Sequence, residues 1–170
     1  MYKIDKTDYE IIKLLKLDGR MRASEIARQL GEKSERAVRY RIDRLVEHGI
    51  ISLTALVQPR GLGLVVVADV LLETDADSIM DVAKTAASYD FVSYVACSIG
   101  ETDISLQVLA ENTSEVYKLV TEVIGKIPGV RKTTTSIVPI VVKEIYQWQI
   151  PQKFVVDKKD EDKEEEKEFT

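Results

Sequence analysis

The chain has 170 residues, of which 45% are hydrophobic and 31% are charged, with a formal net charge of −5. This length and apolar content are enough for a buried core in one domain or in two small ones. No apolar run approaches the roughly 18 residues of a membrane span, and no secretory leader is visible, so we expect a cytoplasmic protein without a membrane partner. A single cysteine, Cys97, excludes an internal disulfide and is expected to be buried, and a single histidine, His48, argues against a metal site.

The charge is distributed unevenly along the chain. Residues 1–50 carry 12 Lys and Arg against 9 Asp and Glu, residues 51–156 carry 8 against 12, and residues 157–170 carry 4 against 8. The N-terminal segment is therefore the only positive one, which is where attraction to nucleic-acid phosphates would act. Because the excess is modest, useful DNA affinity would require a dimer or a larger assembly.

Three helices are predicted in the first 50 residues. Asp5 can cap the first helix, which runs to about Asp18. The second and third helices show one-face apolar spacing and are separated by the polar segment Gly31–Ser34. Gly31 can take the positive φ that ends a helix, and Ser34 can cap the next one. Two short helices joined by such a turn form a helix-turn-helix.

The outward face of the third helix carries guanidinium groups and a phenol once Val38, Ile42 and Leu45 face inward. Such a helix can place its N-terminal residues in the DNA major groove while flanking arginines hold phosphates. We predict groove and base contacts from Arg36, Arg39 and Tyr40, and phosphate contacts from Ser34 and Arg44. Arg41 points toward the core side and is expected to brace the helices. The helix pattern alone is equally compatible with a solvated face that carries pairs such as Arg39–Asp43.

Residues 50–63 predict a wing and a hinge. Ile50–Gln58 has the partial alternation and the β-branched residues that are typical of a strand. Three helices followed by a strand form a winged helix-turn-helix, which we assign to residues 1–58 as a DNA-binding domain. The proline and glycines of Pro59–Gly63 predict a hinge at residues 59–63.

Residues 64–150 predict a second domain with the element order βαββαβ. Strands are expected at Leu64–Leu72, Phe91–Ile99, Asp103–Ala110 and Val130–Val142, and helices at Asp77–Ser88 and Thr113–Lys126. This order predicts a ferredoxin-like sheet with helices on one face, so the chain is of the α+β class. The other face is expected to be largely apolar, and a second copy of the chain is its economical cover, which favours a homodimer.

Residues 151–170 are expected to form an acidic, disordered tail. The run Asp157–Thr170 is almost entirely charged and contains one apolar residue, Phe169. Two roles stay open for it, since its acidity can compete with DNA for the basic helices or can simply keep the chain soluble.

Several ordered blocks of residues 3–147 resemble the Lrp/AsnC family of transcription regulators, the leucine-responsive or feast/famine type. The helix-turn-helix resemblance rests on IDKTDYEIIKLLKLDGR, SEIARQLG and AVRYRIDRLVEHGII, and that of the second domain on GETDISLQV, PGV and TTTSIV. Two departures are visible. The turn Gly31–Ser34 is one residue longer than usual, and Arg22 stands where the family has a helix-capping serine.

The resemblance implies dimers built through the βαββαβ sheets, often assembled into tetramers of dimers. It also implies an amino acid effector, with no other cofactor, bound between dimers near a Gly-x-x-Asp loop. The effector-binding residues expected on this basis are Gly100, Thr102, Asp103, Thr133, Thr135 and Ser136.

The chemistry of these residues suits an amino acid. Gly100 permits close approach of the backbone to a ligand, and the loop amides with Thr102 can hold a carboxylate. Asp103 can hold an α-ammonium group, and the strand hydroxyls can add hydrogen bonds. Without the resemblance, an ordinary β-turn and ordinary strand threonines explain the same residues.

The sequence therefore predicts a sequence-specific DNA-binding transcriptional regulator that an amino acid tunes, and not an enzyme. The alternative is an enzymatic or small-molecule-binding ferredoxin-like module with an accessory helical domain, because that fold hosts many functions. Against the alternative, no nucleophile–base pair, metal cluster or glycine-rich phosphate loop is visible in the sequence. A purely structural oligomer does not explain the basic helix-turn-helix.

Overall fold

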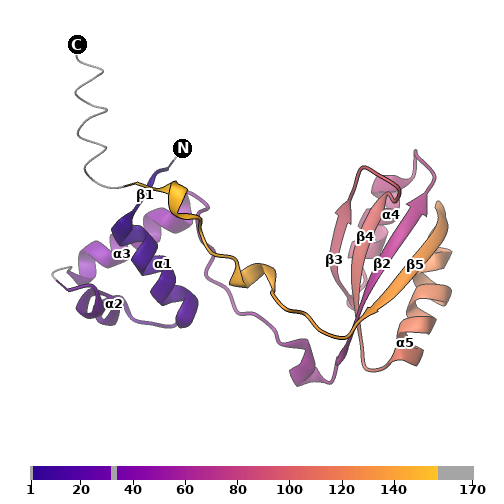
Figure 1. The fold of residues 1–170 in the computed structure, drawn as a ribbon, viewed down its shortest axis with the longest axis horizontal. Coiled ribbons are helices and arrows are strands. Elements are labelled where there is room, and N and C mark those ends of the chain that lie inside the picture. Colours follow the sequence, from indigo (N-terminus) through magenta and orange to yellow (C-terminus); the bar gives the residue numbers. More distant parts are fainter. Residues whose placement is uncertain (1, 32–33, 157–170) are drawn as a thin grey trace, which may run out of the picture. The chain divides into compact units, whose positions relative to one another are not determined.

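The computed structural model describes residues 2–31 and 34–156, and it divides the chain into two compact units. One unit combines Met1–Leu56 with the chain from Ile145 onward, and the other is Val57–Glu144. Figure 1 shows the helices of the first unit and the sheet of the second. Within the described residues, no helix has both the length and the apolar character needed to cross a membrane.

The first unit contains the three predicted helices, α1 (Lys6–Leu17), α2 (Ala23–Gln29) and α3 (Glu35–Glu47). Asp5 caps α1, since its carboxylate accepts a hydrogen bond from the Asp8 amide at 2.8 Å. The roles predicted for Gly31 and Ser34 are confirmed, because Gly31 has a φ of +67° and the Ser34 hydroxyl accepts from the Ala37 amide at 3.2 Å. The core comprises the buried side chains Ile11, Ile12, Ile26, Ala27, Val38 and Leu45. The helix-turn-helix is thus confirmed.

The strand predicted at Ile50–Gln58 is wrong, because residues 51–58 have no regular secondary structure. A strand needs a partner that forms hydrogen bonds with its amides and carbonyls, and no described strand pairs with this segment. The strands of this unit are instead β1 (Ile4–Asp5) and β6 (Val155–Val156), which pair in parallel. After residues 51–58, the chain forms a 3₁₀ turn at Pro59–Leu62.

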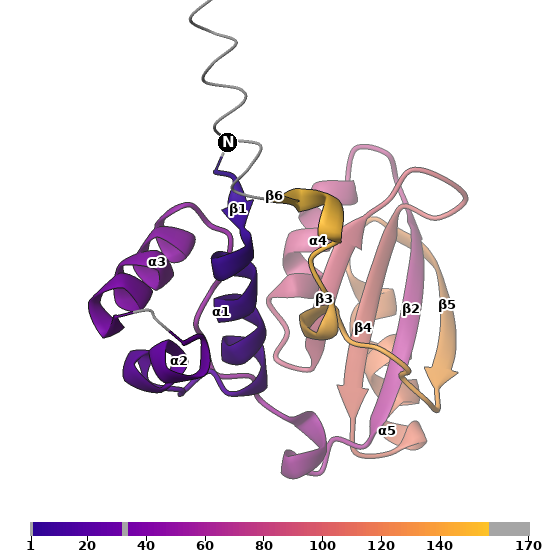
Figure 2. The same ribbon diagram turned by 60° about the vertical axis from the view of Figure 1, so that its left-hand side comes forward.

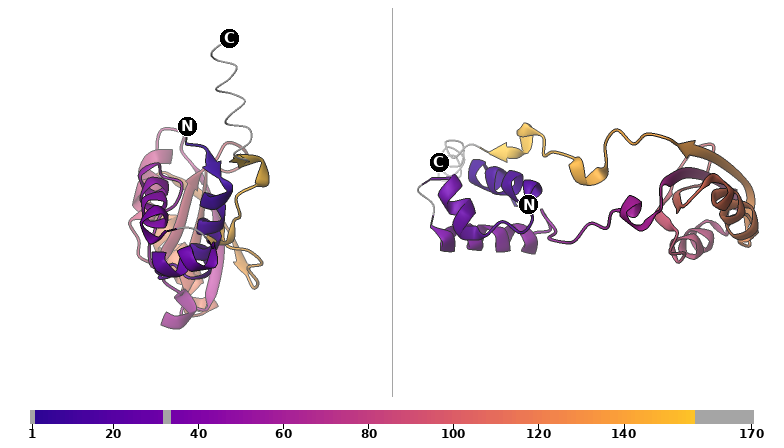
Figure 3. Two further views of the ribbon diagram at one scale, coloured as in Figure 1. Left: turned by 90° about the vertical axis from the view of Figure 1, so that its left-hand side faces the viewer. Right: turned by 90° about the horizontal axis from the view of Figure 1, so that it is seen from below.

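The C-terminal segment departs from the predicted domain boundaries. Residues 145–150 were expected in the ferredoxin-like domain and residues 151–156 in the tail, but both belong to the helix-turn-helix unit. Ile150 packs against the core of that unit, and β6 contacts α1 as well as β1. Figure 3 shows this returning segment in orange and yellow. The predicted disorder of the acidic run 157–170 lies outside the described residues.

The second unit has the predicted βαββαβ order. It comprises β2 (Val66–Thr74), α4 (Ile79–Ala87), β3 (Val92–Cys97), β4 (Ile104–Ala110), α5 (Thr113–Lys118) and β5 (Val130–Val138). The antiparallel strand order is β3-β4-β2-β5, which confirms the ferredoxin-like sheet. The predicted helix at residues 113–126 is helical throughout, but α5 passes into a π turn at Leu119–Val123 and a 3₁₀ turn at Ile124–Lys126.

The two helices cover one face of the sheet and leave the other open (Figure 2). On the covered face, alternate residues of β4 are buried, among them Ile104, Leu106 and Val108. The open face is mixed and not largely apolar, which corrects the sequence prediction. Leu71 and Tyr94 are exposed there beside a hydrogen bond from Gln107 to Asp69, since residues two apart on a strand share one face.

Cys97 is exposed, not buried as expected. It is the last residue of β3, which forms one edge of the sheet. Its Sγ atom lies 4.0 Å from Met80 Sδ on α4, and Met80 is itself exposed. An apolar run at the end of an edge strand has no further layer to cover it, which explains the difference.

Candidate functional site

The N-terminal half of α3 displays the predicted DNA-contacting side chains. Arg36 and Arg39 are exposed, and 61% of Tyr40 is accessible. Arg39 pairs with Glu35 at 2.6 Å, and no Arg39–Asp43 pair occurs. Both partners of this pair are solvent-exposed, so the pair contributes little free energy and a phosphate can replace the carboxylate.

Ser34 and Arg44 lie at the two ends of this face. The Ser34 oxygen accepts the Ala37 amide hydrogen, which leaves the hydroxyl proton able to donate to a phosphate. The Arg44 guanidinium carbon lies 4.9 Å from the Tyr2 ring centroid and 5.7 Å from that of Tyr40. This stacking holds the guanidinium beside the outward face while its N–H groups stay able to donate.

Arg41 braces α3 against α1, as predicted from the sequence. Its Nη1 atom lies 2.8 Å from Asp5 Oδ2 and 2.6 Å from Asp8 Oδ1. The Tyr2 hydroxyl donates to Asp8 Oδ2 at 2.9 Å, so a buried carboxylate is held from both sides. Because each charge in this buried network has a partner, the network fixes the orientation of α3 relative to α1.

The network also shifts the pKa values of Asp5 and Tyr2. Burial by itself raises the pKa of Asp5, but the hydrogen bonds from the Asp8 amide and Arg41 outweigh burial and hold that pKa below its ordinary value. Burial and the hydrogen bond to Asp8 raise the pKa of Tyr2. The ion pair of Asp5 with Arg41 therefore persists at neutral pH.

A groove of about 520 Å³ separates α3 from the chain before α1. It is lined by Tyr2, Lys3, Asp5, Asp8, Ala37, Tyr40, Arg41 and Arg44. The sequence analysis singled out neither Tyr2 nor Lys3. One sequence signal for this groove was available: Asp8 places a carboxylate within the apolar stripe of α1, and such a buried carboxylate needs a cationic partner.

The predicted effector loop connects β3 to β4. No heavy atom lies within 4 Å of the position that a Cβ of Gly100 would take, so the loop is open to close approach at that residue. The Thr102 carbonyl accepts from the Ser98 hydroxyl at 2.9 Å, which closes the loop on itself. The loop geometry thus leaves the Gly100 backbone accessible.

Asp103 is bound within the chain. Its Oδ2 atom accepts from the amide of buried Thr74 at 2.7 Å, and its own amide donates to the Leu72 carbonyl at 2.9 Å. This carboxylate therefore extends the β2–β4 pairing by one residue. Its Oδ1 atom makes no hydrogen bond to the described residues, so that atom can still accept from a ligand.

The predicted strand hydroxyls lie on two different faces of the sheet. Thr133 pairs with Leu72 and Thr135 with Val70, which places both threonines on the helix-covered face. Ser136 pairs with Asp69 on the open face. The Asp103 amide donates to the Leu72 carbonyl, and Thr133 pairs with Leu72 from the other side, so the two residues lie on opposite sides of β2 near the same end of the sheet. One chain therefore brings the loop and Thr133 to the same end of the sheet, but not Ser136.

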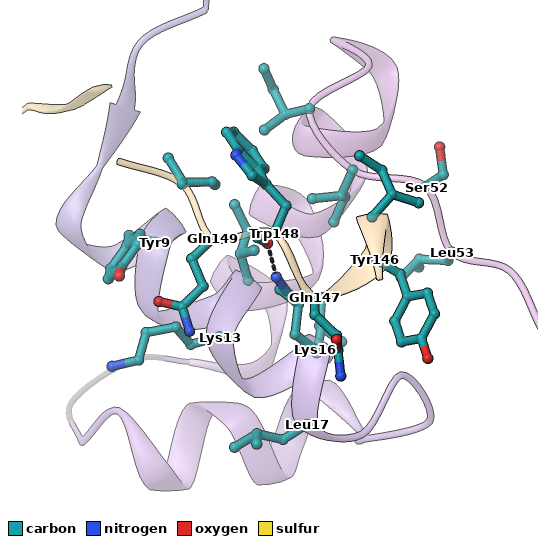
Figure 4. A pocket seen from close by; sticks show the side chains of 16 residues that line it. Tyr9, Lys13, Lys16, Leu17, Ser52, Leu53, Tyr146, Gln147, Trp148 and Gln149 are labelled. Atoms are coloured by element: carbon teal, nitrogen blue, oxygen red, sulfur yellow. Dashed lines mark hydrogen bonds between the residues drawn. The ribbon is translucent and has the colours of Figure 1, made fainter. Parts of the chain in front are cut away.

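An apolar pocket of about 610 Å³ lies within the helix-turn-helix unit. It is formed by α1, residues 50–53 and the returning residues 145–150, and Figure 4 shows Lys16 meeting the Trp148 carbonyl at its centre. The sequence analysis missed it, because the alternation Tyr146-Gln147-Trp148 was assigned to the other domain. No group of three or more His, Cys, Asp or Glu side chains is placed to hold a metal ion in the described chain.

Comparison with known proteins identifies both domains. Residues 4–46 match the AsnC-type helix-turn-helix domain, and residues 66–148 match the Lrp/AsnC ligand binding domain. The chain is 34% identical over 148 residues to the HTH-type transcriptional regulator FL11 of Pyrococcus abyssi, covering 86% of this chain and 97% of FL11. It is 33% identical over 136 residues to the regulator LrpA of Pyrococcus horikoshii, covering 79% and 96%.

Solved structures share the fold at lower identity. E. coli AsnC superposes with a TM-score of 0.78 at 23% identity, over 85% of this chain and 99% of AsnC. A Neisseria meningitidis transcriptional regulator in complex with L-Met gives 0.78 at 24% identity, over 88% and 97%. The chain belongs to the Lrp/AsnC family of transcriptional regulators, with a helix-turn-helix for DNA followed by an Lrp/AsnC ligand-binding domain.

Proposed function

We propose that this regulator acts in the cytoplasm as a homodimer, or as a tetramer of dimers, that reads specific duplex DNA sequences through α3. The observation that carries the proposal is the exposed face of Arg36, Arg39 and Tyr40 on a helix that Arg41 braces from behind. A guanidinium near the N-terminus of such a helix can make bidentate hydrogen bonds to guanine in the major groove. Because residues 1–50 carry only a small positive excess, one copy would bind DNA weakly, which supports binding by two or more copies at each DNA site.

An amino acid is the proposed effector of this assembly. Support comes from the open backbone at Gly100, the accepting Oδ1 atom of Asp103, and a structural neighbour that was solved with L-Met. The loop amides and Thr102 would receive the ligand carboxylate, and Asp103 its ammonium group. Thr133 and Thr135 are proposed to add hydroxyl contacts. Ser136 would contribute only from another copy, because it lies on the opposite face of its own sheet.

A gel-shift titration on the DNA upstream of the protein's own gene, repeated with each of the twenty amino acids, tests this function. We expect a specific shift that one or a few amino acids change. A specific shift that no amino acid alters would leave the DNA reader and remove the effector. The absence of any shift at low salt would contradict DNA recognition by α3.

A further inference from the structure

The described part of the C-terminal segment ends in β6, which contacts β1 and α1. Val156 pairs with Asp5 in the short parallel sheet, and the Asp5 carboxylate binds the Arg41 guanidinium of α3 at 2.8 Å. The next residue, Asp157, begins the run of 14 residues DKKDEDKEEEKEFT. The run therefore begins at the DNA-binding unit, to which Val156 belongs.

The charge of this run is complementary to that of α3. Residues 157–170 contain eight Asp and Glu against four Lys, a net charge of −4. Arg36 and Arg39 face outward on α3, and Arg44 lines the adjoining groove. Arginine binds carboxylates and phosphates with the same planar donor geometry, so side chains that hold DNA phosphates also accept carboxylates.

The length of the run is sufficient for this contact. Fourteen residues span at most about 50 Å, whereas the 13-residue α3 is about 20 Å long. A segment tethered this close to its site has an effective concentration of roughly millimolar. A contact that is weak between separate molecules is therefore populated within one chain.

We propose that the acidic run 157–170 occupies the arginine face of α3 in the absence of DNA and competes with duplex DNA for it. The β1–β6 pairing is the anchor that directs the run to its own helix. Such competition lowers affinity for all duplexes alike, so it favours occupancy of the tightest sites. This inference rests on DNA binding by α3.

The contact itself can be measured without DNA. A fluorescent peptide of residues 157–170 is titrated with a chain that ends at Val156, and anisotropy is recorded at 20 and 500 mM salt. We expect saturable binding at low salt that is lost at high salt, with a dissociation constant of roughly 0.1 mM, because a 10-fold effect on DNA affinity at an effective concentration of about 1 mM requires that value. The Arg36→Ala variant should bind the peptide more weakly. The unchanged protein should also bind more weakly to a peptide in which all eight Asp and Glu are replaced by Asn or Gln. Equal binding of the acidic peptide and of the peptide with amides would overturn the proposal.

The competition is measured by comparing the affinities of three proteins for one DNA duplex. They are the full chain, the chain ending at Val156, and the full chain with the eight tail acids replaced by Asn or Gln. At 50 mM salt, the shortened chain and the chain with the neutral tail should bind the duplex about 10-fold tighter than the full chain. At 500 mM salt this difference in affinity should nearly disappear. Matching thermal melts would show that all three fold alike.

Two other outcomes separate this inference from the function beneath it. Equal DNA affinity for all three proteins, or tighter binding by the shortened chain alone, would overturn electrostatic competition by the run. DNA binding by none of them would instead contradict the proposed function, and the peptide titration would still decide whether the run contacts α3.

Discussion

Arg36 is the residue on which base reading can be tested most directly. It is exposed on the first turn of α3, and no ion pair holds it among the described residues. Arg36→Ala should lower discrimination between the operator and unrelated duplex by about 1–3 kcal/mol if the guanidinium reads a base. Competition gel shifts measure this. Arg131→Ala, an exposed arginine in the other unit, is the matched control, and an equal loss on every duplex would show that Arg36 contacts only phosphate.

Asp103 has a structural role that complicates its proposed role in ligand binding. Because its carboxylate accepts the amide hydrogen of buried Thr74, Asp103→Ala would leave that amide unpaired and cost about 1–3 kcal/mol of stability. Asp103→Asn keeps an oxygen for Thr74 but removes the charge that would bind an ammonium group. We expect Asp103→Asn to melt near the wild-type temperature and to lose amino acid binding in calorimetry. Unchanged ligand affinity would exclude Asp103 from the effector site.

At the scale of elements, the packing of α3 on α1 depends on pH through two groups. The pKa of Asp5 is held below its ordinary value of 3.8, so its stabilising contribution is complete above about pH 4 and is lost as the pH falls through the folded-state value. The pKa of Tyr2 is raised above 10.0, so its contribution is present below about pH 10 and is lost as the pH rises through the folded-state value.

Asp5→Asn should separate the acid-labile contribution from the helix cap. Asparagine caps α1 about as well as aspartate does, but it cannot form the ion pair with Arg41. We expect the variant to be less stable than wild type at pH 7, and the two to converge as the pH falls through the folded-state pKa of Asp5. Circular dichroism melts between pH 2.5 and 7 measure this, with exposed Asp43→Asn as the control. A constant difference across that range would show that the ion pair does not contribute.

The elements themselves were largely predictable because their signals are local. Helical spacing and caps predict α1 and α3 to within a residue or two, and the alternation of Ile104, Leu106 and Val108 marks β4. The prediction of a strand at residues 50–58 was wrong, because alternation shows only that a segment is able to pair with another strand. Pro139 shortened the last strand relative to the prediction, since proline has no amide hydrogen to donate to a sheet.

At the scale of the whole molecule, the open face of the sheet is the surface on which the proposed dimer depends. Leu71 lies there with 38% of its surface exposed, between Ser105 and Thr134. Leu71→Asp should convert dimers to monomers, because two buried and unpaired carboxylates would face each other across the interface. Light scattering after size exclusion measures the mass. Met80→Asp on exposed α4 is the control, and a dimeric Leu71→Asp would place the interface elsewhere.

The sequence by itself determined the helix-turn-helix, the order βαββαβ and the family, since these depend on residues near one another along the chain. It also singled out Arg41 as a brace, because helical periodicity assigns each residue to a face. Only the tertiary structure decided that Val155 and Val156 pair with Ile4 and Asp5, and that Asp103 holds Thr74. It likewise decided which face of the sheet carries Thr135 and which carries Ser136. Those outcomes depend on strand register and on contacts between distant segments, which no local pattern specifies.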